Sequence, residues 1–422
     1  MSIGPVRLSG GVRFAALVAL LALVPTAALR AAEPLTVGFS MSSTGGLASP
    51  GRSALLAMKV WEDDTNAKGG LLGRPVKLVY YDDQSNPGNV PGLYTKLLDV
   101  DKVDLVIGPY GTVMTAPAMP VVMAHNKVVI SLTALAVNRQ FKYPKYFSMV
   151  SLGPKPSVEM SRGFFAVAAA QTPKPRTVAI AAADSEFALN ASEGARESIQ
   201  AAGFKIVYDK AYPPATTDFT PIVRAVQAAN PDIFFMASYP TDSVGLIRAI
   251  NEVGFKPKLL GGAMAGLQAT PIKLQLGPLL NGVITFENWL PAPGLMNPAV
   301  TAMLKTYQAR AVSEGVDPLG YFLGPNAYAE LQILGEAVAE TGGVNDDKIA
   351  DYLRIHTFKT VFGEVRFGPD GEWVEPRQIY VQFRNITGNG IEQFTDPAKE
   401  PVLDPPSLKS GTLIYPYADA LK

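Results

Sequence analysis

Residues 104–140, DLVIGPYGTVMTAPAMPVVMAHNKVVISLTALAVNRQ, decide the predicted fold. The stretch contains a short apolar run, a Gly-Pro-Tyr-Gly turn, a helix-length segment, and a second apolar run that ends in small residues. This order predicts strand, turn, helix, strand and turn. In a parallel sheet both turns lie at one edge, outside the carboxyl ends of the strands, where open α/β sheets bind ligands. The first turn also leads into a helix N-terminus, whose free N–H groups attract a carboxylate.

Alternating strand-like and helix-like patterns continue on both sides of this stretch. They form two blocks of similar length that divide near residue 153, and each block contains successive β-α-β units. The apolar runs outside the opening stretch lie at residues 35–41, 76–81, 177–183, 206–208, 233–236 and 283–286. The sequence therefore predicts an α/β protein of two doubly wound parallel-sheet lobes.

The last third of the chain starts no third series of parallel strands. Helical patterns without new strands must cover an existing sheet, so we expect the chain to return to the first lobe. Period-two patterns flank a Gly-Pro-Asp-Gly turn and predict a hairpin of residues 364–367 with 378–383. The expected division is a signal peptide at 1–32, lobe 1 at 33–153 plus about 287–365, lobe 2 at 154–286 plus about 366–388, and an irregular tail at 389–422.

The first 32 residues have the pattern of a secretory signal peptide. Arg7 and Arg13 precede an unbroken apolar run at 14–24, and small residues follow at 26–32. The run is shorter than the roughly 20 residues that a membrane-spanning helix needs, although an uncleaved anchor stays an alternative. Several small residues allow cleavage, and the sequence does not choose among Ala28, Ala31 and Ala32. No later segment is apolar enough to span, so we expect a soluble mature protein without direct membrane insertion.

Composition describes an ordinary globular chain. Of the 422 residues, 48% are hydrophobic and 18% charged. The absence of cysteine excludes disulfides, thiolate metal sites, a cysteine nucleophile and a lipid-modified cysteine at the cleavage point. Without Arg7, Arg13 and Arg30, 34 basic residues face 37 acidic ones, a net charge near −3. This balance gives no reason to expect binding to nucleic acid or to an anionic membrane.

The sequence offers little for catalysis or for a cofactor. His125 and His356 lie far apart in helix-like segments, whereas a metal site or a nucleophile–base pair needs several convergent side chains, so we interpret both as structural. No nucleophile elbow, P-loop or dinucleotide-binding motif is present. Asp82 and Asp83 could form a metal or acid/base pair, but adjacent strand residues point to opposite faces, which favours helix capping and hinge hydrogen bonds. We expect no catalytic residue, no metal and no cofactor.

Small polar turns instead recur at the predicted carboxyl ends of strands from both lobes. Each could be ordinary turn chemistry, but their recurrence suggests a ligand site that two lobes close by hinge motion. The turns contain Ser43-Thr44, Tyr110-Gly111-Thr112, Thr133-Ala134 and Ser238-Tyr239.

Several motifs resemble a known family. Residues 68–76, KGGLLGRPV, followed by Tyr81-Asp82-Asp83, resemble the N-x-x-GG-x-x-G-x-x-V…D-D signature of periplasmic branched-chain amino-acid-binding proteins, the type I solute-binding components of ABC importers. Later signatures of that family are matched in the same order by residues 106–109, 217–219, 231–232, 327–328 and 362–371. The resemblance covers nearly the whole mature chain. It implies two lobes joined by a three-crossover hinge, with lobe 2 inserted into lobe 1.

The resemblance also implies a set of ligand-binding residues. Thr112 occupies the position of the family's carboxylate-binding hydroxyl, whereas Leu135 replaces a second expected hydroxyl residue. Phe187 corresponds to a tyrosine that packs on the ligand, and Tyr239 to another contact. The acid that pairs with a ligand ammonium should fall near Met264, where the sequence has no acid. The predicted ligand-binding residues are Thr44, Tyr110, Gly111, Thr112, Thr133, Ala134, Phe187, Tyr239 and Met264.

The missing acid bears on the ligand. A buried ammonium without a counter-charge costs several kcal/mol, so the sequence favours an apolar or aromatic carboxylate over a free amino acid. We therefore predict a periplasmic protein, monomeric and not an enzyme, that captures a small carboxylate (a branched-chain or other amino acid, or an aromatic or apolar acid) and presents it to an ABC permease in the inner membrane. A sensor of the same fold that signals to a receptor is the alternative; an enzyme is a third, without a supporting motif.

Overall fold

The structure is a computed structural model that describes residues 1–7 and 33–422. The apolar run and the cleavage zone of the predicted signal peptide lie outside these described residues. Within the described ranges, no helix combines the length and the apolar character that crossing a bilayer requires.

The first lobe is built on short parallel strands. β1 lies between β2 and β3 in one sheet, and β4 pairs with β5 in a second. The backbone N–H of Gly108 donates to the carbonyl of Ile130 at 2.7 Å, which brings the end of β3 beside β4. The turns that follow these two strands therefore lie next to each other. The bounds are β1 Leu35–Met41, β2 Val76–Asp82, β3 Leu105–Val106, β4 Val129–Ser131 and β5 Tyr146–Ser148.

The second lobe contains one seven-stranded sheet in the order β14-β13-β10-β9-β8-β6-β7. Strands β6 to β10 are parallel, whereas β13 pairs antiparallel with β10 and the edge strand β14 pairs antiparallel with β13. β8 and β9 run in register up to Ser238 and Met264, so the residues after them lie side by side. The bounds are β6 Thr177–Ala183, β7 Lys205–Tyr212, β8 Ile233–Ser238, β9 Leu259–Met264, β10 Val283–Glu287, β13 Ile379–Gln382 and β14 Val402–Asp404.

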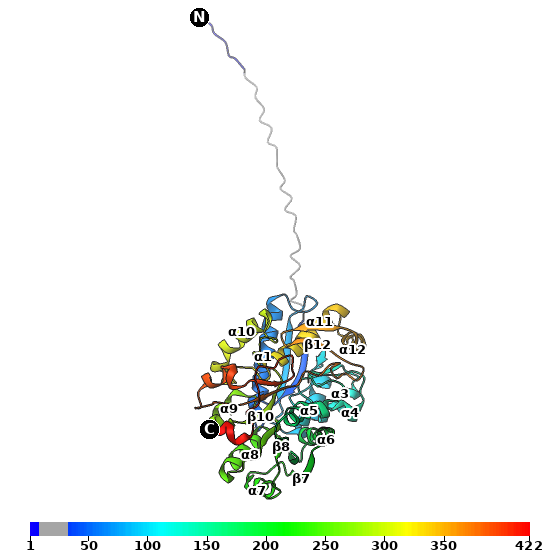
Figure 1. The fold of residues 1–422 in the computed structure, drawn as a ribbon. Coiled ribbons are helices and arrows are strands. Elements are labelled where there is room, and N and C mark those ends of the chain that lie inside the picture. Colours follow the sequence, from blue (N-terminus) through cyan, green and yellow to red (C-terminus); the bar gives the residue numbers. More distant parts are fainter. Residues whose placement is uncertain (8–32) are drawn as a thin grey trace.

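Helices cover both faces of the sheets. α10 and α11 pack against α1, and α12 packs against α11, so these late helices gather at one end of the molecule while α7 and α8 lie at the other (Figure 1). The bounds are α1 Ala48–Ala67, α2 Val90–Thr95, α3 Thr112–Ala124, α4 Asn138–Phe141, α5 Pro156–Ala169, α6 Glu186–Ala201, α7 Thr220–Ala228, α8 Pro240–Val253, α9 Thr270–Leu276, α10 Pro298–Glu314, α11 Gly324–Thr341 and α12 Asp346–Ile355.

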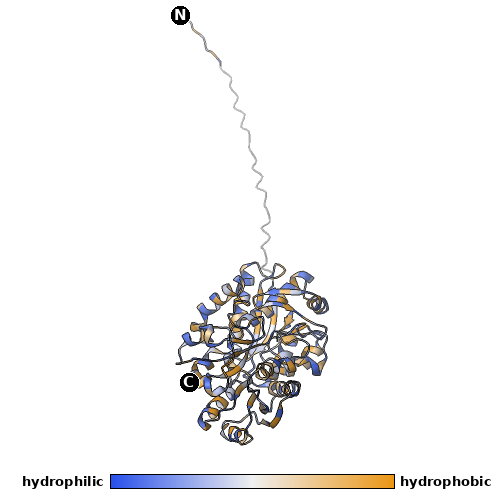
Figure 2. Cartoon of the chain, in the orientation of Figure 1, coloured by the Kyte–Doolittle hydropathy of each residue, from blue (hydrophilic) through white to orange (hydrophobic). Residues whose placement is uncertain are grey.

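Burial explains the composition of the strands. β6, β8 and β9 are apolar almost throughout because helices cover both faces of the sheet. Figure 2 shows apolar residues concentrated in the interior and hydrophilic ones on the outer faces of the helices. The core thus forms without the disulfides that the composition excludes.

Three segments connect the lobes: β5 to α5, β10 to α10, and residues 367–378, which precede β13. The predicted α/β architecture of two parallel-sheet lobes joined by three crossovers is confirmed. The residue boundaries assigned to each lobe stay predictions.

Two local expectations are wrong. The predicted hairpin does not form, because β12 (Gly363–Arg366) pairs with β11 (Thr357–Thr360) and β13 pairs with β10 and β14. The Gly-Pro-Asp-Gly turn instead begins the crossover between the lobes. The tail is not irregular throughout, since its strand β14 covers the free edge of β13 and satisfies the backbone groups that an exposed edge would leave unpaired.

Candidate functional site

A cavity lies between the two lobes at the carboxyl ends of their strands. Its volume is ≈ 50 Å³. We call this space the inner cavity. Its lining residues come from both lobes and from the crossovers: Leu47, Tyr110, Gly111, Thr112, Val113, Thr133, Leu135, Val150, Met160, Phe187, Tyr239, Ala265, Phe286, Asn288 and Phe322.

The N-terminus of α3 forms one wall of the inner cavity. Gly111 caps the helix with φ 87° and ψ 158°, a backbone conformation that glycine adopts without strain. The first hydrogen bonds to the Gly111 carbonyl come from Met114 and Thr115, so the N–H groups of Thr112 and Val113 have no partner in the described part of the chain. Free N–H groups at the positive end of a helix dipole make a site for an anion.

Two threonine hydroxyls stand beside these N–H groups. The backbone N–H of Leu135 donates to Thr112 Oγ1 at 2.9 Å, which orients the hydroxyl and leaves its proton free to be donated. Thr133 Oγ1 is buried and has no hydrogen-bond partner among the described residues. A carboxylate accepts several hydrogen bonds, and its charge strengthens each of them. The first-lobe wall therefore offers two N–H and two O–H donors to one carboxylate.

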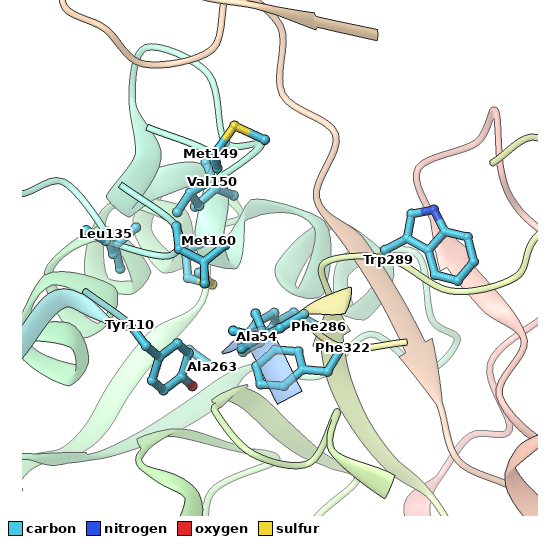
Figure 3. Close-up of a cluster of buried hydrophobic side chains, with 14 of the residues drawn as sticks. Ala54, Tyr110, Leu135, Met149, Val150, Met160, Ala263, Phe286, Trp289 and Phe322 are labelled. Carbon is cyan, nitrogen blue, oxygen red and sulfur yellow. The ribbon is translucent and has the colours of Figure 1, made fainter. Parts of the chain in front are cut away.

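Apolar and aromatic side chains form the rest of the lining. Phe187 packs edge-on against Tyr239 with the ring centroids 5.9 Å apart and an interplanar angle of 74°. Figure 3 shows Tyr110, Leu135, Met160, Phe286 and Phe322 gathered around a common space, whereas the ring of Trp289 lies apart from them. Such walls can bury an apolar or aromatic part of a ligand that makes no hydrogen bonds.

Three further polar side chains line the inner cavity. The Tyr239 hydroxyl accepts from the Phe187 N–H (3.1 Å) and from Ser185 Oγ (3.2 Å), so its own proton is left for a ligand. Burial raises the pKa of Tyr239 to about 12, and it raises that of Tyr110 further, so both phenols stay neutral near pH 7. The Tyr110 hydroxyl and the Asn288 carboxamide make no hydrogen bond to another described residue and can contact a ligand.

None of the residues that the structure places in the lining carries a charge. Glu287 precedes Asn288 in the chain, but its carboxylate is buried on another side, where it binds the Lys273 ammonium at 3.1 Å. A cationic ligand group in the inner cavity would consequently meet hydroxyls, an amide and aromatic faces, and no carboxylate.

The structure brings six of the nine predicted ligand-binding residues together in the lining: Tyr110, Gly111, Thr112, Thr133, Phe187 and Tyr239. It does not place Thr44 there, because the Thr44 hydroxyl donates to Asp82 Oδ2 at 2.7 Å in an exposed loop. Ala134 and Met264 are wholly buried and also lie outside the lining. Their chain neighbours Thr133, Leu135 and Ala265 belong to the lining.

The acidic pair and the histidines have structural partners. Asp82 accepts from the backbone of Ser43, and Asp83 accepts from the hydroxyls of Ser40 and Ser42. His125 stands between the Val121 carbonyl and Asp99. Within the described residues, no group of three or more His, Cys, Asp or Glu side chains could hold a metal ion.

Sequence reasoning missed several lining residues. Asn288 follows the carboxyl end of β10, so the rule that located the other turns could have found it. Met160, Phe286 and Phe322 carry no such signal, because an apolar residue at a helix or strand position is usually part of the core. Their place in the lining depends on how the crossovers bring the lobes together.

Comparison with known proteins identifies the family. The model of the family described as "Periplasmic binding protein" matches residues 34–382, so the chain belongs to that family. This membership of a binding-protein family confirms the prediction that the chain is not an enzyme. The predicted family resemblance is likewise confirmed.

Relatives and solved structures agree with this assignment. The leucine-, isoleucine-, valine-, threonine- and alanine-binding protein of Pseudomonas aeruginosa is 21% identical over 81% of this chain and 88% of its own. The structure of a leucine-binding protein from Thermotoga maritima superposes with a TM-score of 0.72 at 17% identity, over 83% of this chain and 96% of that one. A Rhodopseudomonas palustris solute-binding protein in complex with 4-hydroxybenzoate gives a TM-score of 0.70 at 19% identity, over 84% and 94%. At these identities the structures support the fold alone.

Proposed function

We propose that this member of the periplasmic binding protein family is the solute-binding component of an ABC importer and captures a small carboxylate in the periplasm. In the proposed complex the carboxylate lies at the N-terminus of α3, where it accepts from the N–H groups of Thr112 and Val113 and from the hydroxyls of Thr112 and Thr133. The apolar body packs among Phe187, Phe286 and Phe322. Hinge closure then buries the ligand between the lobes for delivery to the permease.

The absence of charge in the described lining supports a carboxylate without an adjacent ammonium. Enclosing an ammonium without a counter-charge costs several kcal/mol, whereas the free donors at α3 compensate a carboxylate. Related proteins bind both kinds of ligand: the Pseudomonas aeruginosa protein is named for amino acids, and the Rhodopseudomonas palustris structure contains 4-hydroxybenzoate. The lining of this chain favours the second kind.

A thermal-shift screen followed by calorimetry tests the proposal. The panel pairs leucine and phenylalanine with benzoate, 4-methylpentanoate and 3-phenylpropanoate, which lack the ammonium. A ligand at 100 times its Kd stabilises the folded protein by about 2.7 kcal/mol, enough for a clear shift in Tm. We expect the acids without an ammonium to raise Tm more than the amino acids do. Tight binding of leucine with no response to the other acids would contradict the proposed ligand class, and no response to any carboxylate would contradict the function.

A further inference from the structure

A second cavity, which we call the outer chamber, adjoins the inner cavity between the lobes. Its volume is ≈ 370 Å³, against ≈ 50 Å³ for the inner cavity, and it is the more open of the two to solvent. Like the inner cavity, it takes its lining from both lobes: Gly46, Leu47, Ser85, Pro87, Val113, Ser185, Pro214, Tyr239, Pro240, Thr241 and Asp242.

Three residues, Leu47, Val113 and Tyr239, line both cavities. We call them the collar. Leu47 precedes α1, Val113 lies in the first turn of α3, and Tyr239 follows β8. Because Val113 belongs to the collar, the anion site at the start of α3 lies where the two spaces meet. A carboxylate bound there can carry one substituent that enters the inner cavity and another that passes the collar.

The outer chamber differs from the inner cavity in charge. Asp242 lines it, is buried, and forms no ion pair with a described basic residue. Its oxygens accept long hydrogen bonds from the hydroxyls of Tyr212 at 3.3 Å and Thr241 at 3.4 Å. Burial raises the pKa of Asp242, against the opposing effect of the nearby Tyr239 backbone N–H and of these two hydroxyls. No lysine or arginine that the structure describes lines this chamber. Asp242 also stands in the first turn of α8, where an acid stabilises the helix, so a test must separate that role from ligand binding.

We propose that the outer chamber is a subsite for the amino-terminal part of a short peptide whose C-terminal residue is apolar. This inference rests on the proposed function and names its substrate class. The terminal carboxylate lies at α3, and the apolar C-terminal side chain fills the inner cavity. The nitrogen of the C-terminal residue is part of a peptide bond and carries no charge, which suits the uncharged lining of the inner cavity. The terminal ammonium of the peptide lies farther away, near Asp242.

The collar residues suit such a ligand. The free proton of the Tyr239 hydroxyl can be donated to the peptide carbonyl as the chain passes. Ser85, Ser185 and Thr241 line the chamber beyond it. Their hydroxyls donate to the Thr44 carbonyl, to Tyr239 and to Asp242, so they can act toward a ligand as acceptors from its amide N–H groups. A single amino acid would leave this chamber to water.

A ladder of four compounds with one side chain tests the proposal by calorimetry on the full mature chain. The first compound, 3-phenylpropanoate, has no nitrogen, and phenylalanine adds an ammonium next to the carboxylate. N-acetylphenylalanine replaces that ammonium with a neutral amide, and alanylphenylalanine adds a distant ammonium to the amide. We expect alanylphenylalanine to bind at least 10-fold more tightly than 3-phenylpropanoate, N-acetylphenylalanine to lie between them, and phenylalanine to bind most weakly.

Two variants separate the subsite from the fold. Asp242→Asn should weaken alanylphenylalanine about 10-fold and leave N-acetylphenylalanine within 2-fold, a difference that a loss of helix stability would not produce. Thr241→Trp, at an exposed position, should obstruct the chamber and weaken both acylated compounds but not 3-phenylpropanoate; Thr301→Trp, on the exposed face of α10, is the matched control.

The outcomes distinguish this inference from the function on which it rests. If 3-phenylpropanoate binds and alanylphenylalanine binds no more tightly, the peptide subsite is refuted while the carboxylate site stands. If alanylphenylalanine binds tightly but Asp242→Asn leaves its affinity unchanged, the placing of the ammonium is refuted. If no compound of the ladder and no acid of the earlier panel binds, both proposals fail together.

Discussion

The two residues at the carboxyl end of β10, Glu287 and Asn288, lie in opposite environments, one charged and one neutral. On one side Glu287 and Glu400 hold the Lys273 ammonium at 3.1 and 2.8 Å, and all three side chains are at least 90% buried. On the other side Asn288 faces the inner cavity, whose described lining carries no charge. In this cluster buried charges lie beside opposite charges, whereas the described lining of the inner cavity is neutral.

Burial and ion pairing act against each other in this cluster of Lys273, Glu287 and Glu400. Burial disfavours the charged form of Lys273, but the two carboxylates outweigh it and raise the pKa of the ammonium. Burial also raises the pKa of Glu287, against the attraction of Lys273. The two buried carboxylates consequently depend on the Lys273 ammonium for their stabilisation in the folded protein.

The largest expected effect comes from removing that cation. Lys273→Met should destabilise the protein by about 3–5 kcal/mol, because two carboxylates are left buried without a counter-charge. Chemical denaturation measures the free energy of unfolding. Lys258→Met is the control: it breaks the partly exposed pair with Asp232 and should cost less than about 1 kcal/mol. Equal losses of unfolding free energy for the two substitutions would contradict the claim that the buried Lys273 cluster matters more than the partly exposed Lys258–Asp232 pair.

Glu372 extends the comparison to a buried carboxylate that has no cation. It is 3% exposed, and neither carboxylate oxygen has a described hydrogen-bond partner. Burial, with Asp370 nearby, raises its pKa from the ordinary 4.5 to about 8, although the neighbouring Ser148 side chain acts in the opposite direction. A raised pKa means that the folded state binds the proton more tightly than the unfolded chain. The stability that this group contributes is present below pH 4.5 and is lost as the pH rises through about 8.

We therefore expect Glu372→Gln to flatten the fall in stability of the wild-type protein between pH 5 and 8, by up to about 1.4 kcal/mol per pH unit. Denaturation at a series of pH values provides the measurement, with the exposed Glu364→Gln as the matched control. A wild-type and a variant profile that stay parallel across this range would show that Glu372 does not titrate as proposed.

The substitution Asn288→Asp introduces a negative charge into the neutral lining of the inner cavity. Asn288→Asp should weaken binding of an acid such as 3-phenylpropanoate about 100-fold, since like charges in a buried site repel by several kcal/mol. Asn288→Ala removes the amide without adding charge and should weaken binding far less. Calorimetry measures both, and a loss that is the same for the two variants would mean that the carboxylate lies far from Asn288.

The smallest expected effect concerns the donors at α3. Thr133→Val keeps the shape of the side chain and removes a hydroxyl that is buried without a partner, so the ligand should bind about 10-fold more weakly while the free protein is not destabilised. Thr44→Val is the control, because the Thr44 hydroxyl bonds to Asp82 and lies outside the lining. An affinity loss for Thr44→Val that matches that of Thr133→Val would overturn this account of the first-lobe wall.

Much of the first-lobe wall could be predicted from the sequence because its signals are local. Gly111 and Thr112 follow an apolar run and begin a helix, and the carboxyl-end rule then places them at the sheet edge. The same reasoning also chose Thr44, which lies outside the lining because its hydroxyl donates to Asp82, a partner 38 positions away. It also passed over Asn288, which faces the cavity only because β10 passes directly into a crossover.

The sequence by itself determined the α/β class, the two blocks of β-α-β units, and the family, since hydrophobic periodicity and turn residues act over a few neighbouring positions. It also determined that residues 262–264, where the family resemblance places an acid, contain none. Tertiary structure alone decided that β13 joins β10 and β14, that Phe286 and Phe322 line the inner cavity, and that Leu47, Val113 and Tyr239 line both cavities. These features depend on which segments meet across three crossovers, and a contact between distant segments leaves no mark on the local pattern of either one.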